Sequence, residues 1–83
     1  MALTVVYFGK LMDAAGCSEE HIALPDGIAD SEALRGWLDT ARNMHGALLA
    51  PTVRIAVNDA IAKAPLPIRD GDEIAFMPPV GGG

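Results

Sequence analysis

The chain has 83 residues, a net charge of −5 and 51% hydrophobic residues, a composition typical of one folded domain and not of a disordered segment. Its six Lys and Arg residues are scattered singly, which argues against a nucleic-acid-binding face. The single cysteine, Cys17, excludes an internal disulfide, and with no basic residue beside it we expect no reactive role.

The N-terminal run "ALTVVYF" is too short for a membrane helix and has no charged segment before it. We therefore expect no membrane span and a cytoplasmic location. Leu3–Phe8 is rich in β-branched and aromatic residues and predicts a central strand. "GKLMDAAG" predicts a short helical turn ended by Gly16. His21–Pro25 predicts a second strand, which the proline stops.

The segment "DSEALRGWLDTARNMHG" predicts the main helix, with Asp30 as its N-cap and Gly46 as its C-terminal cap. The apolar residues spaced for one buried stripe are Leu34, Trp37, Leu38 and Ala41. We therefore expect Trp37 to lie in the core.

Three further strands are predicted in the second half of the chain. "TVRIAVN" alternates apolar and polar residues, as a half-buried strand does, and a turn at Asn58–Asp59 leads to the short strand "AIAK". "EIAFM" predicts the last strand, with Ile74 and Phe76 on one face and Ala75 and Met77 on the other.

This order of elements predicts an α+β fold in which one main helix packs on one face of a mixed sheet of about five strands. If the last strand pairs beside the central first strand, the architecture is the β-grasp, the ubiquitin-like fold. We expect residues 1–77 to form this domain and residues 78–83 to form an extended, flexible C-terminal tail.

The interior of the predicted domain offers no catalytic constellation. His21 and His45 lack metal-ligand spacing, so no metal site is expected. Glu19–Glu20 and the acidic turn "RDGDE" are interpreted as solvated. "GGG" lacks the Lys-Ser/Thr and the helix of a phosphate loop, and we expect no bound cofactor.

The tail "MPPVGGG" is the most informative segment. Pro78 and Pro79 end the last strand and stiffen an arm of six residues, which spans at most about 20 Å when extended. Glycines without side chains could thread a channel too narrow for other residues. A frayed end or a cloning remnant is the alternative interpretation.

The segment "RDGDEIAFMPPVGGG" resembles the C-terminus of molybdopterin synthase small subunits, the sulfur carriers of molybdenum-cofactor biosynthesis. "VVYFGKLMDAAG", "EALRGWL" and "AVNDAIA" resemble the same family, in the same order, so the resemblance covers most of the chain. Met77 departs from the pattern, because an aromatic residue is common there.

The resemblance implies that a ubiquitin-activating-like adenylyltransferase uses ATP and magnesium to adenylate the carboxylate of Gly83. A sulfur donor then converts it to a thiocarboxylate. Its sulfur passes to a cyclic pyranopterin precursor in the large subunit of the synthase, in a 2+2 heterotetramer. The carrier would be the non-catalytic subunit of this sulfurtransferase.

The resemblance also implies the roles of individual residues. The arm entering the large subunit would comprise Pro78, Pro79, Val80, Gly81 and Gly82, ahead of the reacting Gly83. The partner-facing patch would comprise Phe8, Ile61 and Met77.

Three alternatives stay open at this point. The first is a sulfur carrier for thiamine or tRNA thiolation, which shares the activation chemistry but has a different acceptor. The second is a ubiquitin-like modifier conjugated to protein lysines. The third is an interaction domain whose tail has no chemical role.

Overall fold

A five-stranded mixed sheet forms the centre of residues 2–79, the part of the chain that the computed structural model describes. The strands are β1 (Leu3–Tyr7), β2 (Glu19–Ile22), β3 (Arg54–Val57), β4 (Ala60–Ile61) and β5 (Glu73–Met77). Their order across the sheet is β2-β1-β5-β3-β4. β5 pairs parallel with β1, and the other three pairings are antiparallel. The predicted pairing of the last strand with the first is therefore confirmed.

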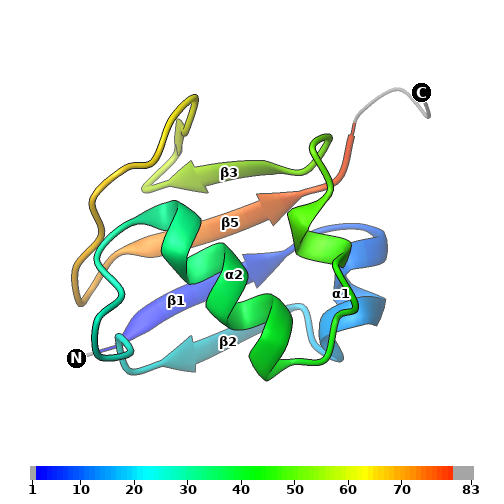
Figure 1. Ribbon diagram of the computed structural model, residues 1–83, viewed down its shortest axis with the longest axis horizontal. Helices are drawn as coiled ribbons and strands as arrows, with labels where there is room; N and C mark the ends of the chain where they lie inside the picture. The colour runs from blue at the N-terminus through cyan, green and yellow to red at the C-terminus, as the bar shows by residue number, and fades with distance from the viewer. Residues whose placement is uncertain (1, 80–83) are drawn as a thin grey trace.

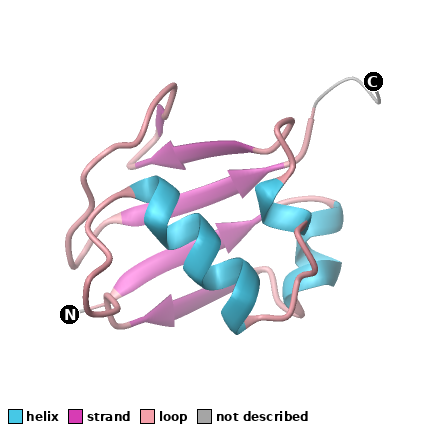
Figure 2. Ribbon diagram, in the orientation of Figure 1, coloured by secondary structure: helices cyan, strands magenta, loops and turns pink. Residues whose placement is uncertain are grey.

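The helical segments of the described chain are α1 (Lys10–Ala15), α2 (Ser31–Ala41) and the 3-10 helix η1 (Ala47–Leu49). α2 crosses one face of the sheet, and α1 lies at the end where β1 finishes (Figure 1). Figure 2 shows no described helix over the opposite face, which is called the open face below. The predicted α+β architecture with one main helix on one face is confirmed.

Alternate residues of the two central strands build the core beneath α2. Leu3, Val5 and Tyr7 of β1 and Ile74 and Phe76 of β5 are at most 1% exposed. The rings of Tyr7 and Phe76 stack, with their centroids 5.9 Å apart. The predicted division of β5 into a core face and an opposite face is therefore confirmed.

β2 begins and ends earlier than the sequence predicts. The prediction placed it at His21–Pro25, whereas the observed strand is Glu19–Ile22. A polar sequence forms this strand because β2 lies at an edge of the sheet, where one backbone side and one face meet solvent.

α2 starts at the predicted residue but ends before the predicted one. Asp30 is the N-cap, and its carboxylate accepts a hydrogen bond of 2.8 Å from a first-turn backbone amide. The predicted helix continues to Gly46, but α2 ends at Ala41. The backbone turns left-handed at Asn43 and His45, where φ is 52° and 55°.

The buried face of α2 includes polar residues that the apolar spacing did not reveal. Leu34 and Leu38 are fully buried as predicted, but Trp37 is 38% exposed, so its assignment to the core was wrong. The polar residues Ser31 and Asp39 are buried instead. The buried Asp39 carboxylate accepts hydrogen bonds from backbone amides at 2.9 Å and 3.0 Å in and beside η1. These bonds offset the cost of burying it.

Candidate functional site

The root of the C-terminal arm is joined to the end of β1. β5 ends at Met77, and the half-buried Pro78 and the exposed Pro79 follow. The backbone amide of Phe8 donates a hydrogen bond of 3.1 Å to the carbonyl of Phe76, which extends the β1–β5 pairing by one residue. The residues from which the arm departs therefore belong to the rigid sheet.

Gly9 allows the chain to pass close to Pro78. Its φ of 57° and ψ of −135° form a conformation that residues with a side chain rarely adopt. A Cβ atom at Gly9 would lie 2.9 Å from Cγ of Pro78, closer than ordinary packing permits. Gly9 thus helps set the direction in which the arm leaves the domain.

We expect Gly9→Ala to lower the free energy of unfolding by about 2 kcal/mol, because it combines an unfavourable φ with a clash against a proline ring. Chemical denaturation at equilibrium measures this change. Gly16→Ala is the matched control: φ at Gly16 is 83°, but a Cβ there would meet nothing within 4 Å. Equal losses for the two variants would contradict a tight contact between Gly9 and Pro78.

The predicted patch residues Ile61 and Met77 lie on the open face. Ile61 is opposite Ala56 on β3, and Ala56 is opposite Ala75 on β5. Directly paired residues share a face, and so do residues two apart on a strand, which places Met77 on the same face. Ile61 is 47% exposed and Met77 is half-buried.

Phe8 lies on the same face by the same rule. It follows the buried Tyr7 and keeps the strand hydrogen bond, so its side chain alternates to the open face. It is 47% exposed and therefore does not belong to the core. The partner-binding role of Phe8, Ile61 and Met77, named here the open-face patch, stays a prediction. Val80, Gly81, Gly82 and Gly83 lie outside the described residues.

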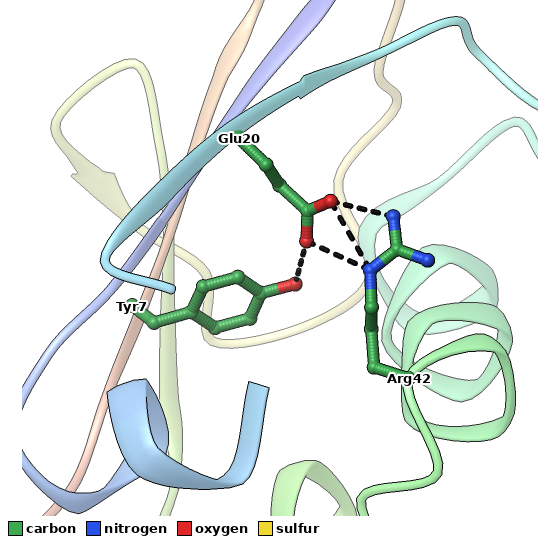
Figure 3. A network of polar contacts seen from close by, with 3 residues as sticks. All are labelled: Tyr7, Glu20 and Arg42. Carbon is green, nitrogen blue, oxygen red and sulfur yellow. Dashed lines mark hydrogen bonds and ion pairs between the residues drawn. The ribbon is translucent and has the colours of Figure 1, made fainter. Parts of the chain in front are cut away.

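Tyr7, Glu20 and Arg42 form a polar network beneath α2 that joins β1, β2 and the C-cap of α2 (Figure 3). The Tyr7 hydroxyl donates to Oε2 of Glu20 at 2.7 Å, and Nε of Arg42 donates to both oxygens at 3.1 Å. The Glu20 and Arg42 side chains are only 16% and 29% exposed. The earlier interpretation of Glu20 as a solvated turn residue was therefore wrong.

The network shifts the ionisation of its members. Hydrogen bonds from Arg42 lower the pKa of the Glu20 carboxyl, although burial opposes this change. Burial and the neighbouring carboxylate raise the pKa of the Tyr7 hydroxyl. At neutral pH the network therefore holds an anion, a cation and a neutral phenol, an arrangement that serves structure and offers no proton donor near pH 7.

Sequence reasoning missed this network because the predicted β2 began one residue after Glu20. In the observed register Glu20 is opposite Val5, a core-facing residue, so it must point towards α2. The signal in the sequence was that Glu20 and Ile22, two residues apart, lie on the same face of a strand, with His21 on the opposite face. Recognising it required the pairing of β2 with β1.

The remaining polar candidates stand apart from the arm and from one another. His21 lies on the β2 edge, where its Nε2 atom is 3.5 Å from the exposed Glu19 carboxylate, and His45 lies in the turn before η1. Cys17 is half-buried against the core. Among residues 2–79, no three His, Cys, Asp or Glu side chains gather as a metal site would require. Within the same residues, no helix has the length and apolar character to cross a membrane.

A family comparison matches residues 5–83, which include the arm, to the ThiS family. The chain belongs to this family. The molybdopterin synthase sulfur carrier subunit of Haemophilus influenzae is 33% identical over 82 residues, 98% of this chain and 99% of that protein. That of Chlamydomonas reinhardtii is 34% identical over 87 residues and spans both chains entirely. The resemblance drawn from the sequence is confirmed.

Several solved structures share this fold. A putative molybdopterin converting factor subunit 1 from Pyrococcus furiosus matches with a TM-score of 0.78 and 26% identity, covering 96% of this chain and 99% of that one. A protein–protein complex of subunits 1 and 2 of the Helicobacter pylori molybdopterin-converting factor contains a matching chain, with a TM-score of 0.66, 27% identity and full coverage of both chains. The small archaeal modifier protein SAMP1 of Haloferax volcanii has a TM-score of 0.80 at 22% identity, with full coverage of both, which supports the fold alone. The β-grasp prediction is confirmed.

Proposed function

We propose that this ThiS-family chain is the sulfur carrier subunit of a molybdopterin synthase and carries sulfur as a thiocarboxylate on Gly83. The observation that carries the proposal is the end-to-end similarity to molybdopterin synthase sulfur carrier subunits, in a family match that extends through residue 83. Residues 1–77 would act as the docking domain, and residues 78–83 as the arm that delivers the sulfur.

The chemistry begins with a carboxylate that cannot react by itself. An α-carboxyl group has a pKa of about 3.5, so at neutral pH it is an anion and a poor electrophile. A ubiquitin-activating-like adenylyltransferase would attach AMP from magnesium-bound ATP and release pyrophosphate. A sulfide-level donor would then displace AMP and leave the thiocarboxylate. The domain would supply no catalytic group of its own to these steps and would use the active sites of its partners.

The second partner would be the large subunit of the synthase, in a 2+2 heterotetramer. The Helicobacter pylori complex of subunits 1 and 2, which includes a similar chain, supports this pairing. The arm would enter the large subunit with its two prolines already extended, which lowers the conformational entropy lost on insertion. The sulfur would pass there to the pyranopterin precursor.

Intact-mass spectrometry tests the carrier chemistry directly. The protein is incubated with an activating enzyme, ATP, magnesium and a sulfide source, and reactions without ATP are the control. The proposal expects the mass to rise by the difference between sulfur and oxygen, with the change located on the C-terminal peptide. An unchanged mass under conditions that convert a known carrier would contradict it.

The acceptor separates this function from the alternatives that share its chemistry. Product formation with the large subunit and the precursor supports the synthase. Conversion to the thiocarboxylate without such a product would indicate a carrier for thiamine or tRNA thiolation. An isopeptide bond from Gly83 to a protein lysine would indicate a modifier.

We expect Met77→Asp to leave the fold intact and to weaken binding to the large subunit by at least about 2 kcal/mol, or roughly thirtyfold in Kd. Met77 lies on the open face, and a carboxylate buried in an apolar interface loses its hydration. Calorimetric titration measures Kd, and Ala23→Asp, which adds the same charge at an exposed site beyond β2, is the control. Unfolding of the Met77→Asp protein would refute the face assignment, and normal binding would place the interface elsewhere.

A further inference from the structure

We propose that a basic groove beside the arm, along the outer edge of β3, binds an extended acidic segment of the large subunit. The basic groove is lined by Arg35, Val53, Arg54, Ala62, Lys63 and Pro79. This inference rests on the proposed function for the identity of the partner, and it assigns to that partner a contact that adjoins the open-face patch at Ile61 and extends beyond it.

The groove consists of two neighbouring hollows at the outer edge of β3 that share part of their lining. One, of about 510 Å³, lies between Arg54, Ile61 and the arm residue Pro79, and the other, of about 240 Å³, lies against the first turns of α2 at Ser31 and Arg35. They share Val53, Ala62 and Lys63. A segment lying along both hollows would therefore begin beside the arm and end at α2.

The shape of the edge favours an extended occupant. β4 pairs with β3 only at Ala56 and Val57. Beyond β4, the backbone amide of Ala62 donates a hydrogen bond of 2.8 Å to the carbonyl of Ile55. The pairing with β4 therefore does not reach Arg54, the first residue of β3. The stretch from Thr52 to Arg54 borders the larger hollow. Edges of this kind accept extended peptide segments.

The charge of the groove favours an acidic occupant. The chain has a net charge of −5, yet three of its six cationic side chains, those of Arg35, Arg54 and Lys63, line these hollows. Among the described residues that line the hollows, Glu32 alone carries a carboxylate. The acidic chain therefore presents positive charge beside the exit of its arm, where it would attract carboxylates.

Arg35 offers a donor for such a carboxylate. Its Nη2 atom contacts the carboxylate of Glu32, while its Nε atom is buried and has no hydrogen-bond partner among the described residues. A buried donor without an acceptor is unfavourable. An incoming carboxylate that reached both Nε and Nη2 would form the paired contact that guanidinium groups favour. Rotation of the Arg35 side chain would bring Nε to it.

The position of the groove indicates that its occupant belongs to the protein that binds the arm, and not to an unrelated protein. Pro79 is part of the wall, and Ile61 belongs both to the groove and to the open-face patch. A protein that encloses the arm must therefore lie against the groove. The groove would fix the orientation of the domain while the arm extends into the partner.

Charge reversal tests the groove in the complete complex. We expect Lys63→Glu and Arg54→Glu each to raise Kd for the cognate large subunit about fivefold at low ionic strength, with the effect declining as salt is added. Arg69→Glu makes the same charge change at an exposed turn outside the groove, and we expect it to alter Kd less than about twofold. Equal changes in Kd for all three variants, or changes in Kd that do not depend on salt concentration, would overturn the proposal.

Two further measurements make the result specific. All three variants should melt like the parent and gain sulfur on Gly83 in the mass assay, so a failure of the groove is distinguishable from a failure of the carrier function. Zero-length carbodiimide coupling of the complex should join the Lys63 amine to an Asp or Glu of the large subunit. Coupling of Lys63 to Gly83 of the same chain or to a second copy, or no coupling at all, would refute the binding of an acidic segment of the large subunit.

Discussion

Deletion of Gly83 is expected to abolish sulfur transfer while leaving the fold unchanged. The deletion moves the terminal carboxylate back by about 3.5 Å along an arm whose root is fixed by the pairing of β5 with β1. A misplacement of about 1 Å can reduce a rate a hundredfold, so a full residue should exceed that loss. Product formation with the purified large subunit and precursor is the measurement.

Gly82→Val tests the same arm without changing its length. A β-branched side chain would stand where the proposed channel accepts only glycine, and we expect a comparably large loss of transfer. A melting curve belongs in the same experiment. We expect unfolding free energies within about 0.5 kcal/mol of the parent, since no described core residue is altered. Normal activity from both variants would eliminate the carrier function.

The second large effect concerns the polar network beneath α2. We expect Glu20→Ala to lower the free energy of unfolding by about 3 kcal/mol at neutral pH, because the partly buried Tyr7 hydroxyl and Arg42 guanidinium lose their shared acceptor. Tyr7→Phe, which keeps the ring and removes one hydrogen bond, should cost only about 1 kcal/mol. Urea denaturation of both variants provides the comparison. Equal costs would show that the Glu20–Arg42 pair adds nothing.

The network also predicts a dependence of stability on pH. The pKa of Glu20 is lower in the folded protein than its ordinary value of 4.5, so its stabilisation is complete above that value. It is lost as the pH falls from there through the folded-state pKa. The difference in stability between the parent and Glu20→Ala should therefore be largest near about pH 7 and shrink near about pH 3. A difference independent of pH would show that Glu20 acts through packing alone.

The elements predicted correctly from the sequence have their signals close together in the chain. β5 was found from alternation over five residues, the start of α2 from its N-cap Asp30, and the β3–β4 turn from Asn58–Asp59, where φ is positive at both residues. In each case the deciding interaction lies within a few residues. Local sequence is then sufficient.

The errors arose where distant residues decide the structure. Ser31 is buried because its hydroxyl accepts a hydrogen bond of 3.0 Å from the amide of Leu66, which lies 35 residues away. Glu20 likewise depends on Arg42, 22 residues away. Such polar partners cannot be read from apolar spacing, because they make polar residues behave as core.

The exposure of the open-face patch residues could be predicted because it required only strand alternation and the family resemblance, while their binding role stays a prediction. The contact of Gly9 with Pro78 and the basic groove could not, because each joins segments that are far apart in the sequence. The extended arm itself stays a prediction from composition. The position of its first residue, Pro78, depends on a close contact with Gly9, which lies near the opposite end of the chain.

The place of β5 in the sheet has a consequence for protein synthesis. β1 with β2 and β3 with β4 form two separate pairs, and only β5, the last described strand, lies between them and joins them. The ribosome therefore releases most of the chain before the sheet can close, and such long-range pairing delays folding until that late strand emerges. A chain truncated before residue 73 would leave both strand pairs with unpaired edges. Each folded copy consequently contains β5, the strand that leads into the arm, so chains that stop before residue 73 do not add to the folded pool.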